Sequence, residues 1–499
     1  MPLRQNKDKF NLFKIDNLKP LLIMKNKSNF TRRGFLATTA TAAAGLTIVP
    51  SNTIAGLGHK APSDKLNIAG IGVGGMGKGN LRRMAGENIV ALCDVDWTTG
   101  GRINVPQVFE TYPKAAQYYD WRKMYDEMGK SIDAIMVATA DHTHAIITAN
   151  AIAMGKHAFT QKPLTHSVYE SRLLTKLAAK HKVATQMGNQ GSSAEGVKLI
   201  CEWIWNGEIG EVKEIEAYTN RPIWPQGLDA PTEVMPVPEG LKWDLFLGPA
   251  KFRQYNSAYH PWVWRGWWDF GTGALGDMAC HIMHPIFTAM KLQSPTKVIG
   301  SSTPFTPDCA PNAEIVHLTY PARKKPANVK IDLPEVQVTW YDGGLKPQFP
   351  DSWPIDRVQN SGVLFHGTKD TLVCGEYGTD PILLSGRVPN VPKTERRIEG
   401  HELDWIRACK ESPENRVATA SDFKDSGPFN EMVVMGVLAT RLQALNKVLH
   451  WDGPNMTFTN VSEDDQLRIS RRNSIPAKEF ADGLIKHNYR DGWSLPDMP

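Results

Sequence analysis

A glycine-rich turn between a strand-like and a helix-like segment constrains the fold more than any other feature. The apolar run at residues 66–71 leads directly into a G-x-G-x-x-G sequence, Gly72-Val73-Gly74-Gly75-Met76-Gly77. Gly72 permits a tight turn, Gly74 lets the backbone approach a pyrophosphate, and Gly77 lets the helix pack closely on the strand. The N-terminus of that helix then faces the phosphate charge. The motif therefore predicts a dinucleotide-binding fold.

The end of the next apolar run indicates which dinucleotide binds. Residues 88–93 are predicted to form a strand ending at Asp94, which lies 94 − 72 = 22 residues after the first motif glycine. A carboxylate at this place accepts hydrogen bonds from the adenosine ribose and repels a 2′-phosphate. We therefore expect NAD rather than NADP, unless Asp94 is only a solvated residue at a strand end.

Apolar and amphipathic segments then alternate, as in a parallel sheet covered by helices. Strands are predicted at residues 134–138, 157–160 and 183–187, with helices at 144–153 and 165–180. Ligands of such sheets lie beyond the carboxyl ends of the strands. The polar residues that follow these strands include Thr139, Asp141, His142, His144, Gln161, Lys162, Asn189 and Gln190. The predicted cofactor-binding set is Gly72, Gly74, Gly75, Met76, Gly77, Asp94, Thr139, His142, His144, Gln161, Lys162 and Asn189.

The second half of the chain has a different pattern. Longer alternating runs at residues 212–218, 314–320 and 336–341 are separated by proline and glycine turns, as in a mixed or antiparallel sheet. A chain of 499 residues exceeds what one hydrophobic core usually organises, so two main domains are expected. We predict an α/β Rossmann domain at 61–188, followed by an α+β substrate-binding domain with a mixed or antiparallel sheet at 189–499.

One helix of the second domain is predicted to carry catalytic groups. Asp277 and His281 are four residues apart, so a helix places the carboxylate and the imidazole on one face. Such a pair acts as a general base with an orienting partner. An exposed helix pair worth roughly 0.2–0.5 kcal/mol has the same spacing and is the alternative. His284 lies nearby, but no convincing further ligand set is apparent, and we expect no metal site.

A tryptophan-rich segment precedes this helix. Four tryptophans fall within the seven residues 262–268, in a glycine-rich loop that also contains Arg265. Flat apolar rings suit the C–H faces of a sugar. Arg265, Trp267 and Trp268 are therefore predicted to contact the substrate, and burial of the rings in an ordinary core is the alternative.

The first 60 residues are predicted to be an export signal and a linker. Arg32 and Arg33 precede Phe35-Leu36 and a weakly apolar run, residues 37–49, that is too short to span a bilayer. This form is typical of a twin-arginine signal, so we expect a periplasmic protein without a stable membrane span.

The formal charge is only +5 and no long basic stretch is present, which argues against nucleic-acid binding. The six cysteines are scattered and predict neither a zinc site nor a disulfide scaffold.

Taken together, these residues resemble the Gfo/Idh/MocA family, which includes glucose-fructose oxidoreductase and inositol dehydrogenase. The family has a Rossmann domain, a Glu-Lys-Pro motif whose lysine reaches the reaction centre, and a Gly-x-Gly-x-Leu-x-Asp-x-x-x-His stretch opening a helix of the second domain. Lys162-Pro163 matches the former motif, and residues 273–281 match the core of the latter. Residues 64–281 carry the resemblance, whereas the long C-terminal part resembles enlarged exported members only in outline. Gln161 replaces the family's usual glutamate, which removes a negative charge beside Lys162.

The resemblance implies an NAD-dependent oxidoreductase that acts on a sugar or polyol. His281 would remove the proton of a hydroxyl while a hydride passes from the same carbon to the nicotinamide. Lys162 and Asp277 would hold and polarise that oxygen. We also expect a tightly held cofactor and a homo-oligomer formed through the second-domain sheet.

Two other functions use the same residues. An NAD-dependent glycosidase or lyase would remove a hydride, break an adjacent bond by elimination, and return the hydride. A non-catalytic sugar or cofactor sensor would use the fold alone. The presence of Lys162, Asp277 and His281 argues against the sensor, but not against the glycosidase.

Overall fold

The structure is a computed structural model, and it describes residues 64–351, 353, 359–469 and 472–499. The predicted export signal, with Arg32 and Arg33, lies outside the described residues. Residues 65–499 form one unit. In this described part of the chain, no helix is both long enough and apolar enough to cross a membrane.

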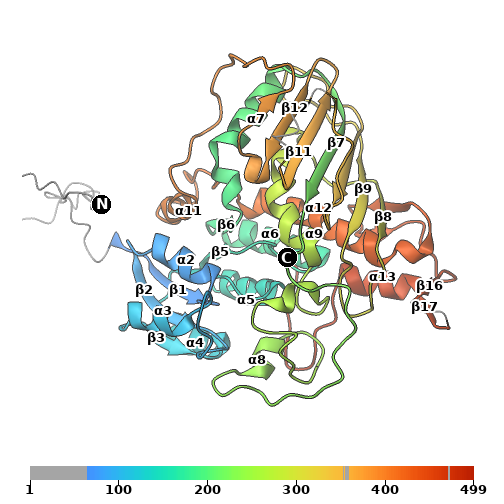
Figure 1. Cartoon of the computed structure of the whole chain (residues 1–499). Helices are drawn as coiled ribbons and strands as arrows, with labels where there is room; N and C mark the ends of the chain where they lie inside the picture. Colours follow the sequence, from blue (N-terminus) through green and yellow to red (C-terminus); the bar gives the residue numbers. More distant parts are fainter. Residues whose placement is uncertain (1–63, 352, 354–358, 470–471) are drawn as a thin grey trace, which may run out of the picture. The chain divides into compact units, whose positions relative to one another are not determined.

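Six parallel strands build the first sheet, in the order β3-β2-β1-β4-β5-β6 (Figure 1). Their bounds are β1 Asn67–Ile71, β2 Asn88–Cys93, β3 Ala116–Tyr118, β4 Ala134–Val137, β5 His157–Thr160 and β6 Thr185–Met187. The strand order reverses between β1 and β4. Ligands of doubly wound sheets bind in the crevice beyond the carboxyl ends of the strands at such a reversal.

Helices cover both faces of this sheet because β1 is apolar on both sides. Ile71 packs with Ile146 and Leu173 on one face, whereas Ile68 packs with Leu81 on the other. The helices of this part of the chain are α2 Met76–Arg83, α3 Val105–Thr111, α4 Trp121–Met128, α5 Asp141–Ala153 and α6 Val168–His181. The glycine-rich turn thus joins β1 to α2.

Helix α6 begins at Val168, three residues later than its predicted start, because Ser167 caps it. The Ser167 N–H donates to Glu170 Oε2 at 3.0 Å, and the Glu170 N–H donates to the Ser167 hydroxyl at 3.4 Å. This capping box satisfies two amide groups that no helical carbonyl can reach. The predicted apolar stripe of the helix is buried, namely Leu173, Leu174, Leu177 and Ala178.

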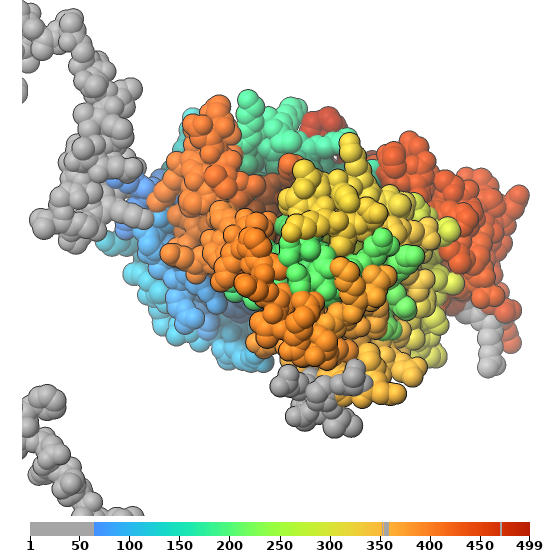
Figure 2. All heavy atoms as spheres, turned by 90° about the horizontal axis from the view of Figure 1, so that it is seen from above, coloured from blue at the N-terminus to red at the C-terminus, as the bar shows by residue number. Residues whose placement is uncertain are grey.

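The second sheet contains nine strands in the order β13-β12-β11-β7-β10-β9-β8-β14-β15. Their bounds are β7 Val212–Thr219, β8 Lys297–Ser302, β9 Glu314–Tyr320, β10 Val336–Tyr341, β11 Ser361–Gly367, β12 Thr371–Gly375, β13 Ile382–Leu383, β14 Leu449–Asp452 and β15 Thr457–Phe458. Strand β7 pairs in parallel with β10 and antiparallel with β11, so the sheet is mixed. Figure 2 shows green atoms between orange and yellow ones, as this order requires. The predicted fold class is confirmed.

The helices of the second half join the two sheets. They are α7 Glu195–Asn206, α8 Trp243–Leu247, α9 Gly273–Ile282, α10 His284–Ala289, α11 His401–Cys409, α12 Phe423–Arg441 and α13 Ala477–Ile485. Helix α12 packs against α6 of the first half and against α9 and β8 of the second. A short hairpin, β16 Gln466–Arg468 and β17 Ser474–Pro476, lies near the C-terminus.

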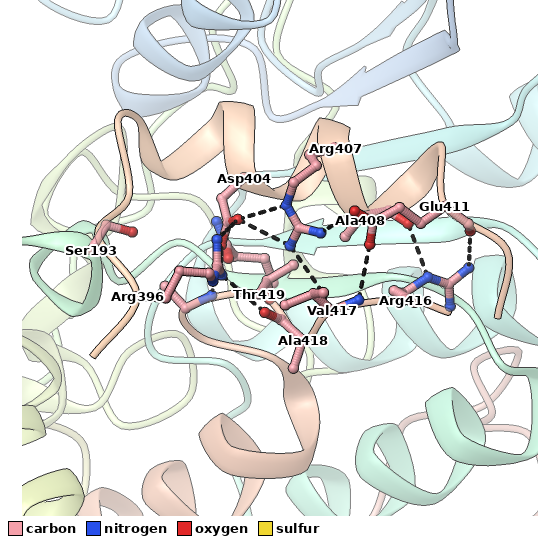
Figure 3. Close-up of polar contacts among 12 residues, drawn as sticks. Ser193, Arg396, Asp404, Arg407, Ala408, Glu411, Arg416, Val417, Ala418 and Thr419 are labelled. Atoms are coloured by element: carbon pink, nitrogen blue, oxygen red, sulfur yellow. Dashed lines mark hydrogen bonds and ion pairs between the residues drawn. The ribbon is translucent and has the colours of Figure 1, made fainter. Parts of the chain in front are cut away.

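Helix α11 returns to the first sheet, although the predicted boundary at residue 188 assigns it to the second domain. Trp405 is fully buried among the residues that cover the first sheet, and its ring centroid lies 5.7 Å from that of Phe159. Figure 3 shows Arg396 and Arg407 pointing toward Asp404, which accepts from Arg396 at 2.6 Å and from Arg407 at 3.1 Å. These ion pairs hold α11 and its flanking loops together.

Candidate active site

The glycine-rich turn has the geometry of a phosphate-binding loop. Gly72 has a φ of +75°, and a Cβ added there would lie 2.6 Å from the carbonyl group of Ala138. A Cβ on Gly77 would collide with the Gly72 carbonyl oxygen. Both positions therefore require glycine. Gly75, at a φ of +52°, has open space around it, and Met76 is 46% exposed at the rim of the turn.

Asp94 lies beside this turn at the carboxyl end of β2. Its Oδ2 accepts hydrogen bonds from the Val73 N–H at 2.8 Å and the Gly74 N–H at 3.4 Å, and its Oδ1 accepts from the Asp96 N–H at 3.1 Å. Burial raises the pKa of Asp94 to about 6. The carboxyl group thus shapes the turn and stands where the ribose of a dinucleotide is expected.

The histidines after β4 hold loops together. His142 Nε2 lies 3.0 Å from the Phe246 carbonyl oxygen, and His144 Nδ1 lies 2.8 Å from that of Pro163. His144 Nε2 also faces the carbonyl of Thr139, 3.1 Å away. Burial lowers the pKa of both histidines to about 4, so both rings are neutral. Their ring nitrogens face protein carbonyls, which differs from the cofactor contacts expected for them.

Asn189 follows β6 and is fully buried. Neither its side-chain oxygen nor its side-chain nitrogen has a hydrogen-bond partner among the described residues. A buried amide without partners is costly in a folded protein. Asn189 is therefore available for a ligand that presents both a donor and an acceptor.

Lys162 and Asp277 meet across the two halves of the chain. Lys162 Nζ donates to Asp277 Oδ1 at 2.7 Å and to the Asp277 carbonyl at 2.9 Å, and Arg265 Nε donates to Asp277 Oδ1 at 3.2 Å. Burial alone would raise the pKa of Asp277, but the charges of Lys162 and Arg265 hold it well below its usual range. The Asp277 carboxylate is therefore ionised, and it accepts hydrogen bonds from the two cations Lys162 and Arg265.

His281 lies one turn further along α9, close to Tyr377. It is only 5% exposed, and its Nδ1 has no partner in the described part of the chain. Burial, with the Lys162 charge second, lowers its pKa well below the usual value. The ring is thus neutral and able to accept a proton. The ring centroid of Tyr377 lies 4.5 Å from that of His281.

Asp141 and Tyr377 were not in the predicted site sets. Asp141 is 3% exposed and accepts a hydrogen bond from the Thr272 hydroxyl at 2.9 Å. Burial, with the Asp277 charge second, raises the pKa of Asp141 to about 7. The place of Asp141 after the carboxyl end of β4 indicates from the sequence that it can lie near a bound ligand. Tyr377 lies in the short helix η6 (Glu376–Gly378) with a φ of +64°, and no sequence motif indicates it.

Gln161 joins the site to helix α11. Its Nε2 donates to Asn80 Oδ1 at 2.9 Å, and Asn80 Nδ2 donates to Glu402 Oε1 at 2.8 Å. Arg83 forms an ion pair with the same Glu402 oxygen at 3.3 Å. A neutral amide suits this place because Asn80 presents its oxygen to it. The carboxylate of this hydrogen-bond network is that of Glu402, which belongs to the C-terminal half of the chain.

The tryptophan segment divides between core and surface. Trp267 and Trp268 are 2% and 5% exposed, so the predicted sugar-stacking surface is not formed by these two rings. The Trp267 Nε1 donates to the Ala258 carbonyl at 2.6 Å, which fixes the ring inward. Trp262 is 38% exposed, and the Arg265 guanidinium carbon lies 4.3 Å from the ring centroid of Trp264. Of the predicted substrate residues, Arg265 is the one that reaches Asp277.

These features define a dinucleotide-dependent oxidoreductase fold, in which a second domain brings a carboxylate and an imidazole to a lysine of the Rossmann domain. Residues 66–189 match the family model described as the NAD-binding Rossmann fold of the Gfo/Idh/MocA oxidoreductase family. Residues 210–323 match the C-terminal alpha/beta domain of the same family. The chain therefore contains Gfo/Idh/MocA oxidoreductase domains, and its NAD-binding Rossmann domain is the one predicted from the sequence.

Curated relatives cover part of the chain. A glycosyl hydrolase family 109 protein of Shewanella pealeana is 27% identical over an alignment 214 residues long, and the match covers 37% of this chain and 45% of that protein. Inositol 2-dehydrogenase of Serratia proteamaculans is 29% identical over an alignment 152 residues long, and the match covers 29% of this chain and 43% of that protein. The chain thus spans less than half the length of these two relatives.

Solved structures resemble a larger part of the chain than these curated relatives do. Levoglucosan dehydrogenase in complex with NADH and levoglucosan is 16% identical with a TM-score of 0.50, covering 77% of this chain and 99% of that one. The WlbA dehydrogenase from Bordetella pertussis, in complex with NADH and UDP-GlcNAcA, is 14% identical with a TM-score of 0.50, covering 76% and 97%. At these identities the likeness shows the fold.

Proposed function

We propose that this protein is an NAD-dependent oxidoreductase that transfers a hydride between a hydroxyl-bearing carbon of a sugar or polyol and a tightly held nicotinamide. The observation that carries the proposal is the ion pair of Lys162, which follows β5, with Asp277, which lies one helical turn before His281 on α9. Two of the three Lys162 N–H groups are bonded to Asp277. The third has no acceptor among the described residues and can donate to a substrate oxygen.

The residues present fit NAD. At Gly72 and Gly77 there is no room for a side chain. The turn can therefore keep the tight form in which a pyrophosphate approaches the backbone. Asp94 offers a carboxyl group beside that turn, and the unpartnered amide of Asn189 offers a donor and an acceptor. These groups support NAD over NADP, because backbone N–H groups, and no cation of the described residues, are bonded to the Asp94 carboxyl group.

The protein residues handle the proton and the oxygen. Oxidation of the alcohol removes a hydride from carbon and a proton from oxygen, and leaves a carbonyl group. Bound NAD would supply the acceptor for the hydride and its two electrons. His281 accepts the proton because its ring is neutral. Lys162 stabilises the charge that develops on the oxygen, and Asp277 holds Lys162 in place.

A glycosidase that uses the same residues is the second candidate. It is favoured by the glycosyl hydrolase family 109 relatives and by Asp141, whose pKa of about 7 suits a group that gives or takes a proton near neutrality. The hydride would be returned after elimination of the glycosidic bond. Released aglycone from an aryl glycoside without net NADH would favour this candidate.

The decisive experiment follows the nucleotide that purifies with the protein. The nucleotide is released by denaturation and identified by mass spectrometry, and its reduction by sugars and polyols is followed in single turnovers at the nicotinamide absorbance. We expect NAD and reduction by at least one sugar or polyol. His281→Ala tests the proposed base, and its matched control is His450→Ala, at an exposed histidine of β14. Protein without bound or bindable nucleotide would contradict the proposal.

Compartment and assembly belong to the same proposal. We place the protein in the periplasm, on the basis of Arg32 and Arg33.

We also propose a homo-oligomer formed through the second sheet. Strand β9 alternates buried and half-buried residues, so one face of the sheet is incompletely covered by the chain. Light scattering on the purified protein tests the assembly, and a monomer would contradict it.

A further inference from the structure

Trp262 is the most exposed ring of the tryptophan segment, and the proposed mechanism does not use it. Its exposed fraction is 38%, whereas Trp267 and Trp268 are 2% and 5% exposed. Trp262 immediately precedes the short helix η4 (Val263–Gly266), which carries Arg265. The segment thus buries two of its rings and leaves this one at the surface.

Arg265 joins this ring to the candidate active site. The Arg265 Nε donates to Asp277 Oδ1 at 3.2 Å, and its Nη1 donates to the Trp262 carbonyl oxygen at 3.1 Å. The guanidinium carbon lies 5.8 Å from the ring centroid of Trp262. The same Asp277 oxygen accepts from Lys162 Nζ at 2.7 Å. One guanidinium therefore separates the exposed ring from the carboxylate that holds Lys162.

A second tryptophan supports the ring of Trp262. The rings of Trp224 and Trp262 meet edge to face, with centroids 5.9 Å apart at an interplanar angle of 90°. Trp224 is 4% exposed, and its Nε1 donates to Gln226 Oε1 at 2.8 Å. A Cβ on Gly266 would lie 2.5 Å from the Pro225 carbonyl oxygen, so η4 packs closely on the segment that carries Trp224. The exposed ring is thus held before a ligand binds, which lowers the ordering cost of binding.

The surface next to Trp262 contains further apolar residues. Pro261, which precedes it, is exposed, and Ile223, which precedes Trp224, is 59% exposed. Apolar surface with a few polar groups that fix orientation is typical of ligand sites. The flat face of an aromatic ring suits the C–H groups of a sugar. Because the proposed substrate is a sugar, the expected occupant of this surface is a sugar ring.

We propose that Trp262 stacks on a second ring of the substrate, so that the protein acts on one sugar unit of an oligosaccharide. This inference rests on the proposed function and names its substrate class. Lys162 and His281 would engage the hydroxyl of the reacting unit. Trp262 would hold the neighbouring unit on the other side of Arg265.

The exposed ring sets the expected size of the preference. A monosaccharide bound at Lys162 and His281 would leave the ring of Trp262 in water, whereas a disaccharide of suitable linkage would cover it. We expect such a disaccharide to be preferred about tenfold in kcat/KM, which corresponds to about 1.4 kcal/mol. Burial of part of an aromatic side chain contributes on this scale.

The test compares monosaccharides with disaccharides that contain them, on the nucleotide-loaded protein. Glucose is compared with maltose and cellobiose, and galactose with lactose, by single-turnover reduction of the bound nucleotide and by calorimetry. We expect a preference of about tenfold for at least one disaccharide. Trp262→Ala should lose this preference, and Trp262→Phe, which keeps a ring, should retain part of it. Phe252→Ala removes a ring that is 64% exposed, and this control should behave as wild type.

The two readouts separate this inference from the proposed function. Wild-type protein that is reduced as fast by each monosaccharide as by its disaccharides would overturn the inference and leave the oxidoreductase in place. If no sugar reduces the nucleotide, calorimetry still decides, because Trp262-dependent binding of a disaccharide needs no turnover. Absence of such binding, or equal binding by wild type and Trp262→Ala, would overturn the inference. A change of oligomeric state in Trp262→Ala, measured by light scattering, would instead assign the ring to an interface between copies.

Discussion

Asp141 should make the stability of the protein depend on pH, and Asp141→Asn should remove that dependence. The side chain is 3% exposed, and burial with the Asp277 charge raises its pKa from the ordinary 3.8 to about 7. The native state therefore binds this proton more tightly than the unfolded chain does. The resulting stability is fully present below about pH 4 and is lost as the pH rises through about 7.

The magnitude follows from the difference between the two pKa values. One pKa unit corresponds to about 1.4 kcal/mol, so the whole effect amounts to about 4 kcal/mol. About 3 kcal/mol of it should be lost between pH 5 and pH 8. Asparagine keeps an oxygen for the Thr272 hydroxyl but cannot ionise. The variant should therefore lose less stability than the wild type over this range.

Urea unfolding of the nucleotide-loaded protein at pH 5, 6, 7 and 8 measures the effect. The quantity of interest is the difference between wild type and Asp141→Asn, because other buried acids such as Glu170, whose pKa burial raises to about 7, contribute equally to both. Asp126→Asn, at an exposed position of α4, is the control and should follow the wild type. Parallel curves for wild type and Asp141→Asn would refute the reasoning.

Three further predictions concern the cofactor, the catalytic groups and the compartment. His281→Ala and Lys162→Ala should retain bound nucleotide but lose roughly 10²-fold or more in single-turnover rate, and a wild-type rate for His281→Ala would remove that residue from the mechanism. Asp94→Ser should narrow or reverse the preference for NAD in binding measurements, and tighter binding of NADP by the unmodified protein would contradict this reading. Replacement of Arg32 and Arg33 by lysine should leave the precursor inside the cell when fractions are compared, whereas unchanged export would contradict the proposed route.

The Rossmann half could be predicted closely because its signals are local. The strand predicted at residues 88–93 coincides with β2, and the one at 157–160 coincides with β5. Apolar runs of this length, bounded by turns, specify buried parallel strands without reference to distant residues. The approach of Lys162 to Asp277 could be expected only through the family resemblance, because the two residues are 115 positions apart.

Other parts of the site depend on packing that no local pattern records. Trp267 and Trp268 are core residues here because their rings find a buried surface, and the sequence alone does not distinguish such a ring from one that faces a ligand. Tyr377 reaches His281 through an unusual backbone conformation in a segment without periodicity.

The return of α11 to the first sheet means that the nucleotide-binding half is not a separable module. Trp405 fills space over Phe159, and Glu402 completes the hydrogen bonds of Asn80 on the helix that follows the glycine-rich turn. A fragment cut after residue 188 would expose this apolar surface to water and leave a buried amide without its acceptor. Exchange of Rossmann domains between related chains would therefore succeed only if the donor supplied its own counterpart of α11, so the two halves are constrained to evolve together.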